Sequence, residues 1–256
     1  GSATPIKEGY LFTPGSKPYT NLNRDMPNQN YTGAVLTFTI SGSTGVEGVT
    51  LNGLPGNPRS GANGAYNVTV PFNWSGTVKP EKEGHTFEPA EMPYTDIITS
   101  YPNQDYYANP ITFTISGSAG MDSVEMTGLP GPAVFTDGNG YYTAVVNWGW
   151  SGTVKPVKAG YKFVPSTGNY TKLKADKTQD YTPEPIMLTI SGSTGLEGVK
   201  MEGLPGEVVT GSGGTYSAEV DWAFSGMVIP MKEGYEFNPT DYTYTAIAKD
   251  QKNKNY

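Results

Sequence analysis

Apolar and polar residues alternate along three separate stretches of the chain. Between Tyr66 and Trp74 every second residue is apolar, and the residues between them are Asn, Thr and Pro. The same alternation recurs at 142–150 and 216–224. A period of two places side chains on one face of a β-strand, so each stretch predicts a strand with one buried face. Shorter alternating runs at 36–40 and 111–115 predict further strands.

The chain repeats itself at a fixed interval. The tetrapeptide Ile-Ser-Gly-Ser begins at Ile40, Ile115 and Ile190, which is a spacing of 75 residues both times. A Gly-Leu-Pro-Gly turn recurs at the same interval, at 53–56, 128–131 and 203–206. Self-similarity at a fixed period indicates an array of similar structural units.

The beginning of the chain fits the same register. Residues 7–10, Lys-Glu-Gly-Tyr, match residues 82–85, Lys-Glu-Gly-His, in the second half of a repeat. We therefore expect the chain to be a piece of a longer array, with an incomplete repeat followed by three full ones. Their expected bounds are 1–33, 34–108, 109–183 and 184–256.

The strand and turn signals predict the fold class. We expect about seven short strands per repeat, which favours a two-sheet sandwich. Length changes fall in turns: the second repeat gains a residue between Gly131 and Gly140 and loses one between Tyr170 and Gln179. The connection from Tyr106 to Ile111 is short. The prediction is an all-β chain of tandem Ig-like β-sandwich domains, arranged as an elongated array.

Three motifs carry a resemblance to a known group of proteins. They are Trp-Ser-Gly-Thr-Val-Lys-Pro at 150–156, Gly-Tyr-Lys-Phe-Val-Pro at 160–165 and Gln-Asp-Tyr at 179–181. This order resembles the Ig-like repeat modules of bacterial surface and secreted proteins and, more loosely, carboxypeptidase-regulatory-like β-sandwiches. The third repeat departs from the pattern at Phe224 and Met227. The resemblance implies an extracellular or cell-surface location, a non-catalytic role as stalk, spacer or adhesive segment, and no transferable catalytic residue.

Composition removes several classes of function. The chain has no cysteine, which excludes disulfides, thiol nucleophiles and Cys-type zinc sites. Its formal net charge of -7 argues against a nucleic-acid partner. No apolar run is long enough to span a membrane. The single histidine, His85, stands where other repeats have Tyr10, Tyr161 and Tyr235, so we interpret it as a packing residue. We expect no enzyme activity, cofactor or metal.

Two sets of acidic residues recur at equivalent positions. Glu47, Asp122 and Glu197 could help to bind calcium through oxygen ligands, although a solvated turn is the favoured interpretation. Asp105 and Asp180 are replaced by Asn30 and Asn255 in the other repeats. Because Asn keeps the hydrogen-bond acceptor and loses the charge, the exchange favours a turn or junction hydrogen bond over acid catalysis.

The tryptophans are the candidate ligand-binding residues. Their flat rings could stack on sugars, but they continue the apolar face of a strand, which favours packing in the core. They are Trp74, Trp148, Trp150 and Trp222.

The leading hypothesis is a non-catalytic stalk, spacer or adhesive segment of a bacterial cell-surface or secreted protein. The alternative is an array of carbohydrate-binding modules attached to a polysaccharide-acting protein. An enzyme would need an active site built from carboxylates at a junction between repeats. The expected partners are an extracellular glycan or protein, or a second molecule that pairs through residues 1–33, where unpaired strand edges would need partners.

Overall fold

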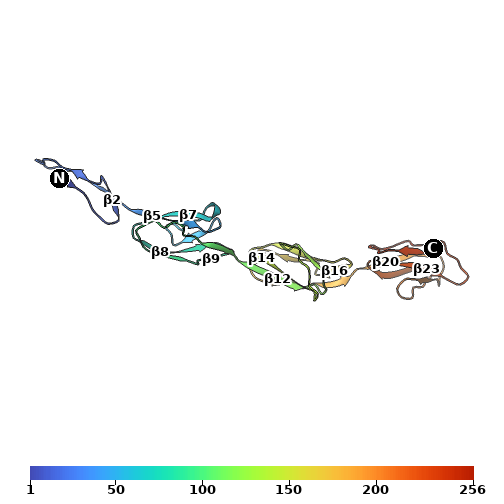
Figure 1. Cartoon of the computed structure of the whole chain (residues 1–256). Coiled ribbons are helices and arrows are strands. Elements are labelled where there is room, and N and C mark those ends of the chain that lie inside the picture. The colour runs from blue at the N-terminus through green and yellow to red at the C-terminus, as the bar shows by residue number, and fades with distance from the viewer. The chain divides into compact units, whose positions relative to one another are not determined.

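The computed structural model describes residues 1–256, and its secondary structure consists of β-strands and one short 3-10 turn, η1, at Ala62–Gly64 (Figure 1). The predicted all-β class is confirmed. No element has the helical length and apolarity needed to cross a lipid bilayer. The chain separates into two compact units, Gly1–Thr112 and Phe113–Tyr256, which are described in turn.

The first unit contains β1 to β11. Their bounds are β1 Ser2–Ala3, β2 Tyr10–Thr13, β3 Lys17–Pro18, β4 Thr32–Val35, β5 Thr37–Ser43, β6 Thr50–Asn52, β7 Ala65–Pro71, β8 Trp74–Glu81, β9 His85–Glu88, β10 Met92–Ile97 and β11 Tyr107–Pro110. The antiparallel pair β5–β7 and the three-stranded sheet β10–β8–β6 enclose a core that includes Ile40, Leu51 and Val78. The pairs β1–β3, β2–β4 and β9–β11 complete the unit.

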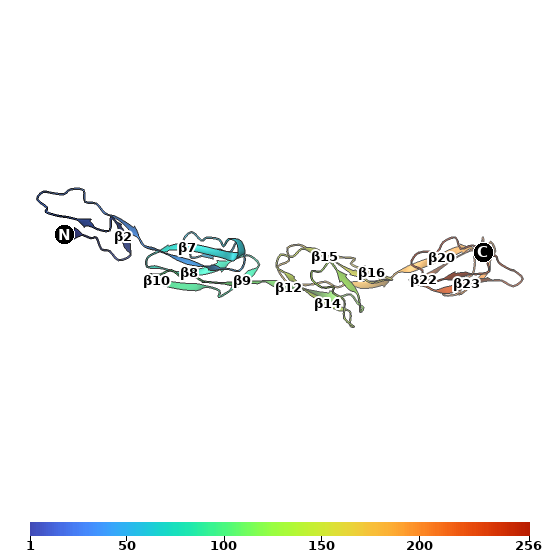
Figure 2. The same ribbon diagram turned by 45° about the horizontal axis from the view of Figure 1, so that its top comes forward.

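The second unit contains β12 to β24. Their bounds are β12 Thr112–Ser118, β13 Glu125–Thr127, β14 Tyr141–Asn147, β15 Gly152–Val157, β16 Tyr161–Val164, β17 Gly168–Tyr170, β18 Lys177–Thr178, β19 Thr182–Pro185, β20 Met187–Ser193, β21 Lys200–Glu202, β22 Thr215–Asp221, β23 Gly226–Met231 and β24 Tyr242–Tyr244. The sheets β14–β12–β18 and β13–β15–β17 enclose one core. The pair β20–β22 and the sheet β21–β23–β24 enclose another, and β20, β22 and β23 lie together in Figure 2.

The molecule has three separate clusters of buried apolar residues. Each cluster takes its members from one predicted repeat: residues 38–106, 113–181 and 186–256. The predicted boundaries at 34, 109 and 184 stay a prediction, because compactness alone divides the chain into two units. The observed sheets and cores are β-sandwiches.

The alternating stretches form the expected strands, with one correction. Burial alternates along β14 and β22 as the pattern predicts. However, none of the three stretches is a single strand. β7 ends at Pro71, Phe72 and Asn73 form a turn, and Trp74 begins β8. β14 and β22 likewise end before turns at 148–149 and 222–223. In the first stretch the reason is the left-handed conformation of Asn73, with φ of 60°, which reverses the chain.

The last segment of each repeat runs parallel to its first strand. The bridges join Ile40 to Tyr101, Ile115 to Lys177, and Ile190 to Gln251. Tyr106 then donates its backbone N–H to Ser43 O at 2.8 Å and its hydroxyl to Val78 O at 3.1 Å. Because Ser43 and Val78 belong to different sheets, the tyrosine of the Gln-Asp-Tyr motif ties the two sheets together. Tyr181 and Tyr256 make the equivalent pairs of bonds.

Candidate functional site

Trp74 and Trp150 are packing residues of the Trp-Ser-Gly motif. Both side chains are half-buried against the core of their own repeat. The Trp74 ring lies over Gly76, where an added Cβ would be 2.7 Å from Cζ2, and its centroid is 6.0 Å from that of Tyr94. Trp150 lies over Gly152 in the same way. The motif therefore needs glycine because the indole ring occupies the place of a side chain.

Trp150 should be replaceable by phenylalanine but not by alanine. Phe224 holds the equivalent position in the third repeat and packs on Tyr244 with a centroid distance of 6.2 Å. We expect Trp150→Phe to cost less than about 1 kcal/mol and Trp150→Ala about 2 kcal/mol, because only the second leaves a large void. Urea unfolding measures both. Equal stability of the two variants would contradict the packing role.

Trp148 and Trp222 lie in the turns that follow β14 and β22. The Lys174 ammonium is 4.7 Å from the Trp148 ring centroid, which is a cation–π contact. Trp222 packs against Gly160, where an added Cβ would be 3.0 Å from Cδ1. Trp74 thus belongs to the first unit, and Trp148, Trp150 and Trp222 belong to the second. Sugar stacking on them stays a prediction.

One residue connects successive repeats, and the backbone holds it from both sides. Ile186 donates its N–H to Gly160 O at 2.8 Å, and its carbonyl accepts the N–H of Trp222 at 3.2 Å. In the first unit Leu36 is held in the same way by Gly9 and Phe72, at 2.8 Å each. The strand on the N-terminal side is also paired, β16 with β19 and β2 with β4. A connection with these hydrogen bonds has little conformational freedom.

Lysine ammonium groups occupy the surroundings of the candidate calcium residues. Lys158 donates to the backbone carbonyl of Asp122 and lies 3.3 Å from its carboxylate. The hydrogen bond from Lys158 holds the pKa of Asp122 below its ordinary value. Lys82 and Lys232 donate likewise to the carbonyls of Glu47 and Glu197. A lysine ammonium thus lies at a backbone oxygen of each of the three positions, where it would oppose the binding of a calcium ion, and this favours the solvated turn.

Asp105 and Asp180 act as hydrogen-bond acceptors within the fold. Their Oδ1 atoms accept the N–H of Ser43 at 2.7 Å and of Ser118 at 2.8 Å. Asn255 accepts the N–H of Ser193 in the same position at 3.0 Å. The hydrogen bond predicted from the Asp–Asn exchange is confirmed.

His85 lies beside an aromatic ring, as expected for a packing position. Its ring stacks on Phe87 with a centroid distance of 6.5 Å, and Nδ1 lies 3.2 Å from Glu83 O. No group of three or more His, Cys, Asp or Glu side chains gathers in a way that could hold a metal ion.

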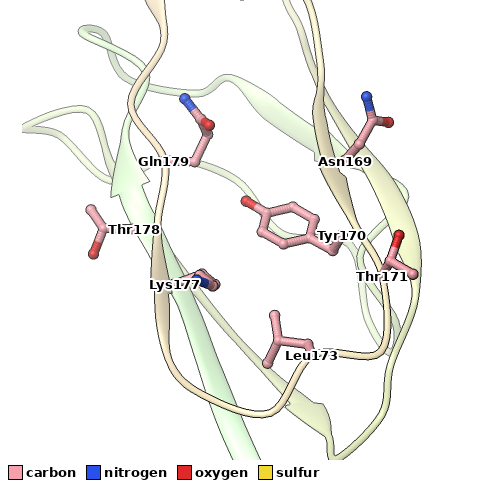
Figure 3. Close-up of a pocket in the computed structure, with 7 residues that line it drawn as sticks. All are labelled: Asn169, Tyr170, Thr171, Leu173, Lys177, Thr178 and Gln179. Carbon is pink, nitrogen blue, oxygen red and sulfur yellow. The ribbon is translucent and has the colours of Figure 1, made fainter.

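A cavity of about 300 Å³ opens beside Tyr170 in the second repeat. It lies between β17, the loop that follows it and β18 (Figure 3). The Tyr170 ring points from β17 into the space between these segments, with Leu173 on one side of it and Gln179 on the other (Figure 3). Its lining residues are Asn169, Tyr170, Thr171, Leu173, Lys177, Thr178 and Gln179. The pattern of alternation gave no sign of this cavity, although the one-residue deletion between Tyr170 and Gln179 marks the place.

Comparison with known proteins gives one distant relative and a shared fold. No protein-family model matches the chain. Chitinase ChiA of Flavobacterium johnsoniae is 28% identical over 217 residues, which make up 75% of this chain and 13% of that protein. The chain thus matches only a small part of the length of that chitinase.

Two solved structures align with most of the chain. The Bacillus anthracis TIE protein aligns over 88% of this chain and 53% of its own, with a TM-score of 0.53 and 10% identity. The major pilin subunit BcpA of Bacillus cereus aligns over 86% of this chain and 98% of its own, with a TM-score of 0.44 and 9% identity. The alignment with the TIE protein shows that the two chains share their fold.

Proposed function

We propose that the chain is a non-catalytic segment of tandem Ig-like repeats that spaces or presents other domains of a bacterial surface or secreted protein, outside the cell. The observation that carries the proposal is the hydrogen-bonded one-residue connection, seen at Leu36 and again at Ile186. A chain of closed sandwiches joined in this way resists bending and can hold attached domains at a defined separation. The fold shared with the TIE protein agrees with this proposal.

Distance measurement between spin labels tests the stiffness of the connection at Ile186. The chain has no cysteine, so exposed Val145 and Val209 can be replaced by cysteine and labelled selectively. We expect a narrow distance distribution. Inserting four Gly-Ser residues between Pro185 and Ile186 should broaden it at least twofold, because a single residue then no longer joins Gly160 to Trp222 through its two backbone bonds.

The same insertion at Gly138 provides the matched control. Gly138 lies in an exposed turn of the second repeat and has no atom near its Cβ direction. This control should leave the distribution narrow. A wild-type distribution as broad as that of the linker variant would contradict a spacer role.

A second candidate function is carbohydrate binding by the array. It is favoured by the sequence similarity to a protein named as a chitinase. Binding through Trp74 and Trp150 would require the two rings to leave their packing contacts with Tyr94 and Tyr170. Shielding of tryptophan fluorescence from a soluble quencher by chitin fragments would support this second function, and its absence would favour the spacer.

We further propose that residues 1–33 pair with a second copy of the chain. Leu22 is 61% exposed, whereas Ile97, the residue 75 positions later, is 1% exposed within its repeat. Tyr31 still donates its hydroxyl to Ala3 O at 2.8 Å, as Tyr106 does to Val78 O. Residues 1–33 therefore have the fold of a second half-repeat while they expose the face that a full repeat covers. Two such faces from two molecules could cover each other.

Light scattering at increasing protein concentration measures this pairing. We expect the wild type to dimerise, and Leu22→Asp to weaken the dimer at least tenfold, because a carboxylate would be buried in an apolar contact. Ile98→Asp is the matched control, since Ile98 is 59% exposed in the corresponding loop of the first full repeat. A monomeric wild type, or equal loss in both variants, would contradict the proposal.

A further inference from the structure

Tyr94 of the first full repeat corresponds to Tyr170 of the second, because it contacts Trp74 as Tyr170 contacts Trp150. The surroundings of Tyr94 show what can fill the space beside this tyrosine. Tyr94 has Trp74 on one side and Tyr101 on the other, where the two rings meet edge to face at 5.7 Å and 88°. Its hydroxyl donates to Gln104 Oε1 at 3.2 Å. Tyr94 is therefore enclosed by its own repeat.

The second repeat lacks the enclosing ring. Lys177 pairs with Ile115 as Tyr101 pairs with Ile40, so an exposed lysine stands where the first repeat has an aromatic ring. Tyr170 keeps its contact with Trp150, at 5.7 Å, and the cavity of about 300 Å³ opens beside it. We call this cavity the Tyr170 pocket.

A polar atom at this pocket also lacks its partner. The Tyr170 hydroxyl is buried and makes no hydrogen bond. Gln179, the counterpart of Gln104, donates instead to Asp180 O at 2.7 Å. A buried hydroxyl without a partner costs free energy, which a turned Gln179 side chain would recover. The equivalent Tyr244 hydroxyl of the third repeat also lacks a partner.

The lining of the Tyr170 pocket has two kinds of surface. The Tyr170 ring and Leu173 are apolar, whereas Asn169, Lys177 and Gln179 carry amide and ammonium groups around them. Asn169 Oδ1 accepts the Thr153 hydroxyl at 2.7 Å, which fixes the amide and leaves its NH₂ group to donate elsewhere. A pyranose has the matching pair of surfaces, because its C–H groups form an apolar face and its hydroxyls a polar rim.

We propose that the Tyr170 pocket binds one pyranose ring of a glycan. The ring would rest on Tyr170 and Leu173, with its hydroxyls at Asn169, Lys177 and Gln179. A phenol ring, the group that fills this place in the first repeat, would match the apolar surface but would leave the amides and the ammonium without partners. The inference goes beyond the spacer function, since a spacer needs no ligand.

Titration of the full ¹⁵N-labelled chain tests the proposal. The probes are a trisaccharide of N-acetylglucosamine and a trisaccharide of galacturonic acid. We expect saturable shift changes confined to residues 169–179, for at least one probe, with a dissociation constant on the order of 1 mM, as befits one small ring.

A single substitution closes the pocket. Lys177→Tyr supplies the ring that Tyr101 supplies in the first repeat, and should weaken binding at least tenfold. Gln251→Tyr makes the same change at the equivalent position of the third repeat and should leave binding unchanged.

The outcomes decide the proposal. Absence of shift changes with both sugars, changes that map elsewhere, or undiminished binding by a folded Lys177→Tyr variant would each overturn it. Binding of a tyrosine-containing peptide in place of either sugar would assign the pocket to a protein partner and overturn it as well. If Lys177→Tyr does not fold, the proposal is decided by whether the shift changes of the wild-type chain are confined to residues 169–179. Failure here leaves the spin-label result untouched, so the two proposals fail separately.

Discussion

Above pH 10 the first full repeat is expected to lose up to about 4 kcal/mol of folding free energy per pH unit. Three tyrosines are buried in it, Tyr66, Tyr94 and Tyr106. Burial raises the pKa of Tyr94 to about 12, and raises the pKa of the other two further. Each tyrosine that ionises only in the unfolded chain contributes about 1.4 kcal/mol per pH unit.

The sign of the effect follows from the neutral form being favoured in the folded state. The stabilisation is complete below the unfolded pKa, near 10, and is lost as the pH rises toward the folded pKa values. The other repeats hold equivalent tyrosines with raised pKa values, so the whole chain should respond.

Urea unfolding between about pH 8 and pH 12, followed by circular dichroism and tyrosinate absorbance, measures the slope. Tyr106→Phe is the matched variant, and should reduce the slope of the first repeat by about a third, since one of three ionisations is removed. Full tyrosinate absorbance in a chain that keeps its strand signal would contradict the burial of these hydroxyls.

Replacement of Gly192 by alanine is expected to destabilise the third repeat by about 3 kcal/mol or more. An added Cβ at Gly192 would overlap the backbone carbonyl of Lys254, in the segment that pairs in parallel with β20. Because the obstacle is backbone, the segment must move and give up bonds such as Lys254 N–H to Ser191 O, at 3.0 Å.

Gly211→Ala is the control for this substitution. Gly211 lies in the same repeat, has no atom within 4 Å of its Cβ direction and does not adopt a left-handed conformation. It should change the stability by less than about 0.5 kcal/mol. Trp222 is the single tryptophan of residues 184–256, so its fluorescence reports the unfolding of this repeat. Equal losses of stability in the two variants would contradict the prediction that the close approach of the Lys254 carbonyl requires glycine at position 192.

The strands could be predicted where a local pattern exists. Burial alternates along β14 and β22 as the alternation of Tyr, Ala and Val requires. The turn at Phe72 and Asn73 was missed because a two-residue turn preserves the alternation: Phe72 and Trp74 continue the apolar positions of β7 although the chain has reversed. A left-handed Asn at the turn is the one sign that could have revealed it.

The pairing of segments far apart in the chain could not be predicted from the sequence. The parallel approach of Tyr101 to Ile40 joins segments about 60 residues apart, and neither segment indicates its partner. The Tyr170 pocket depends on the same pairing, because Lys177 lies in the second repeat at the position that Tyr101 holds in the first. The interpretation of the tryptophans as packing residues holds at Trp74, Trp150 and Trp222, which pack against the cores, although a turn separates Trp74 and Trp150 from the strands whose alternation suggested it.

Stretching single molecules from end to end tests most directly whether the chain consists of independent sandwich repeats. The three separate cores predict three unfolding events of similar size, each releasing the length of about 75 residues, or roughly 25 nm of extended chain. Two events that release the lengths of residues 1–112 and 113–256, or one event for the whole chain, would contradict the account.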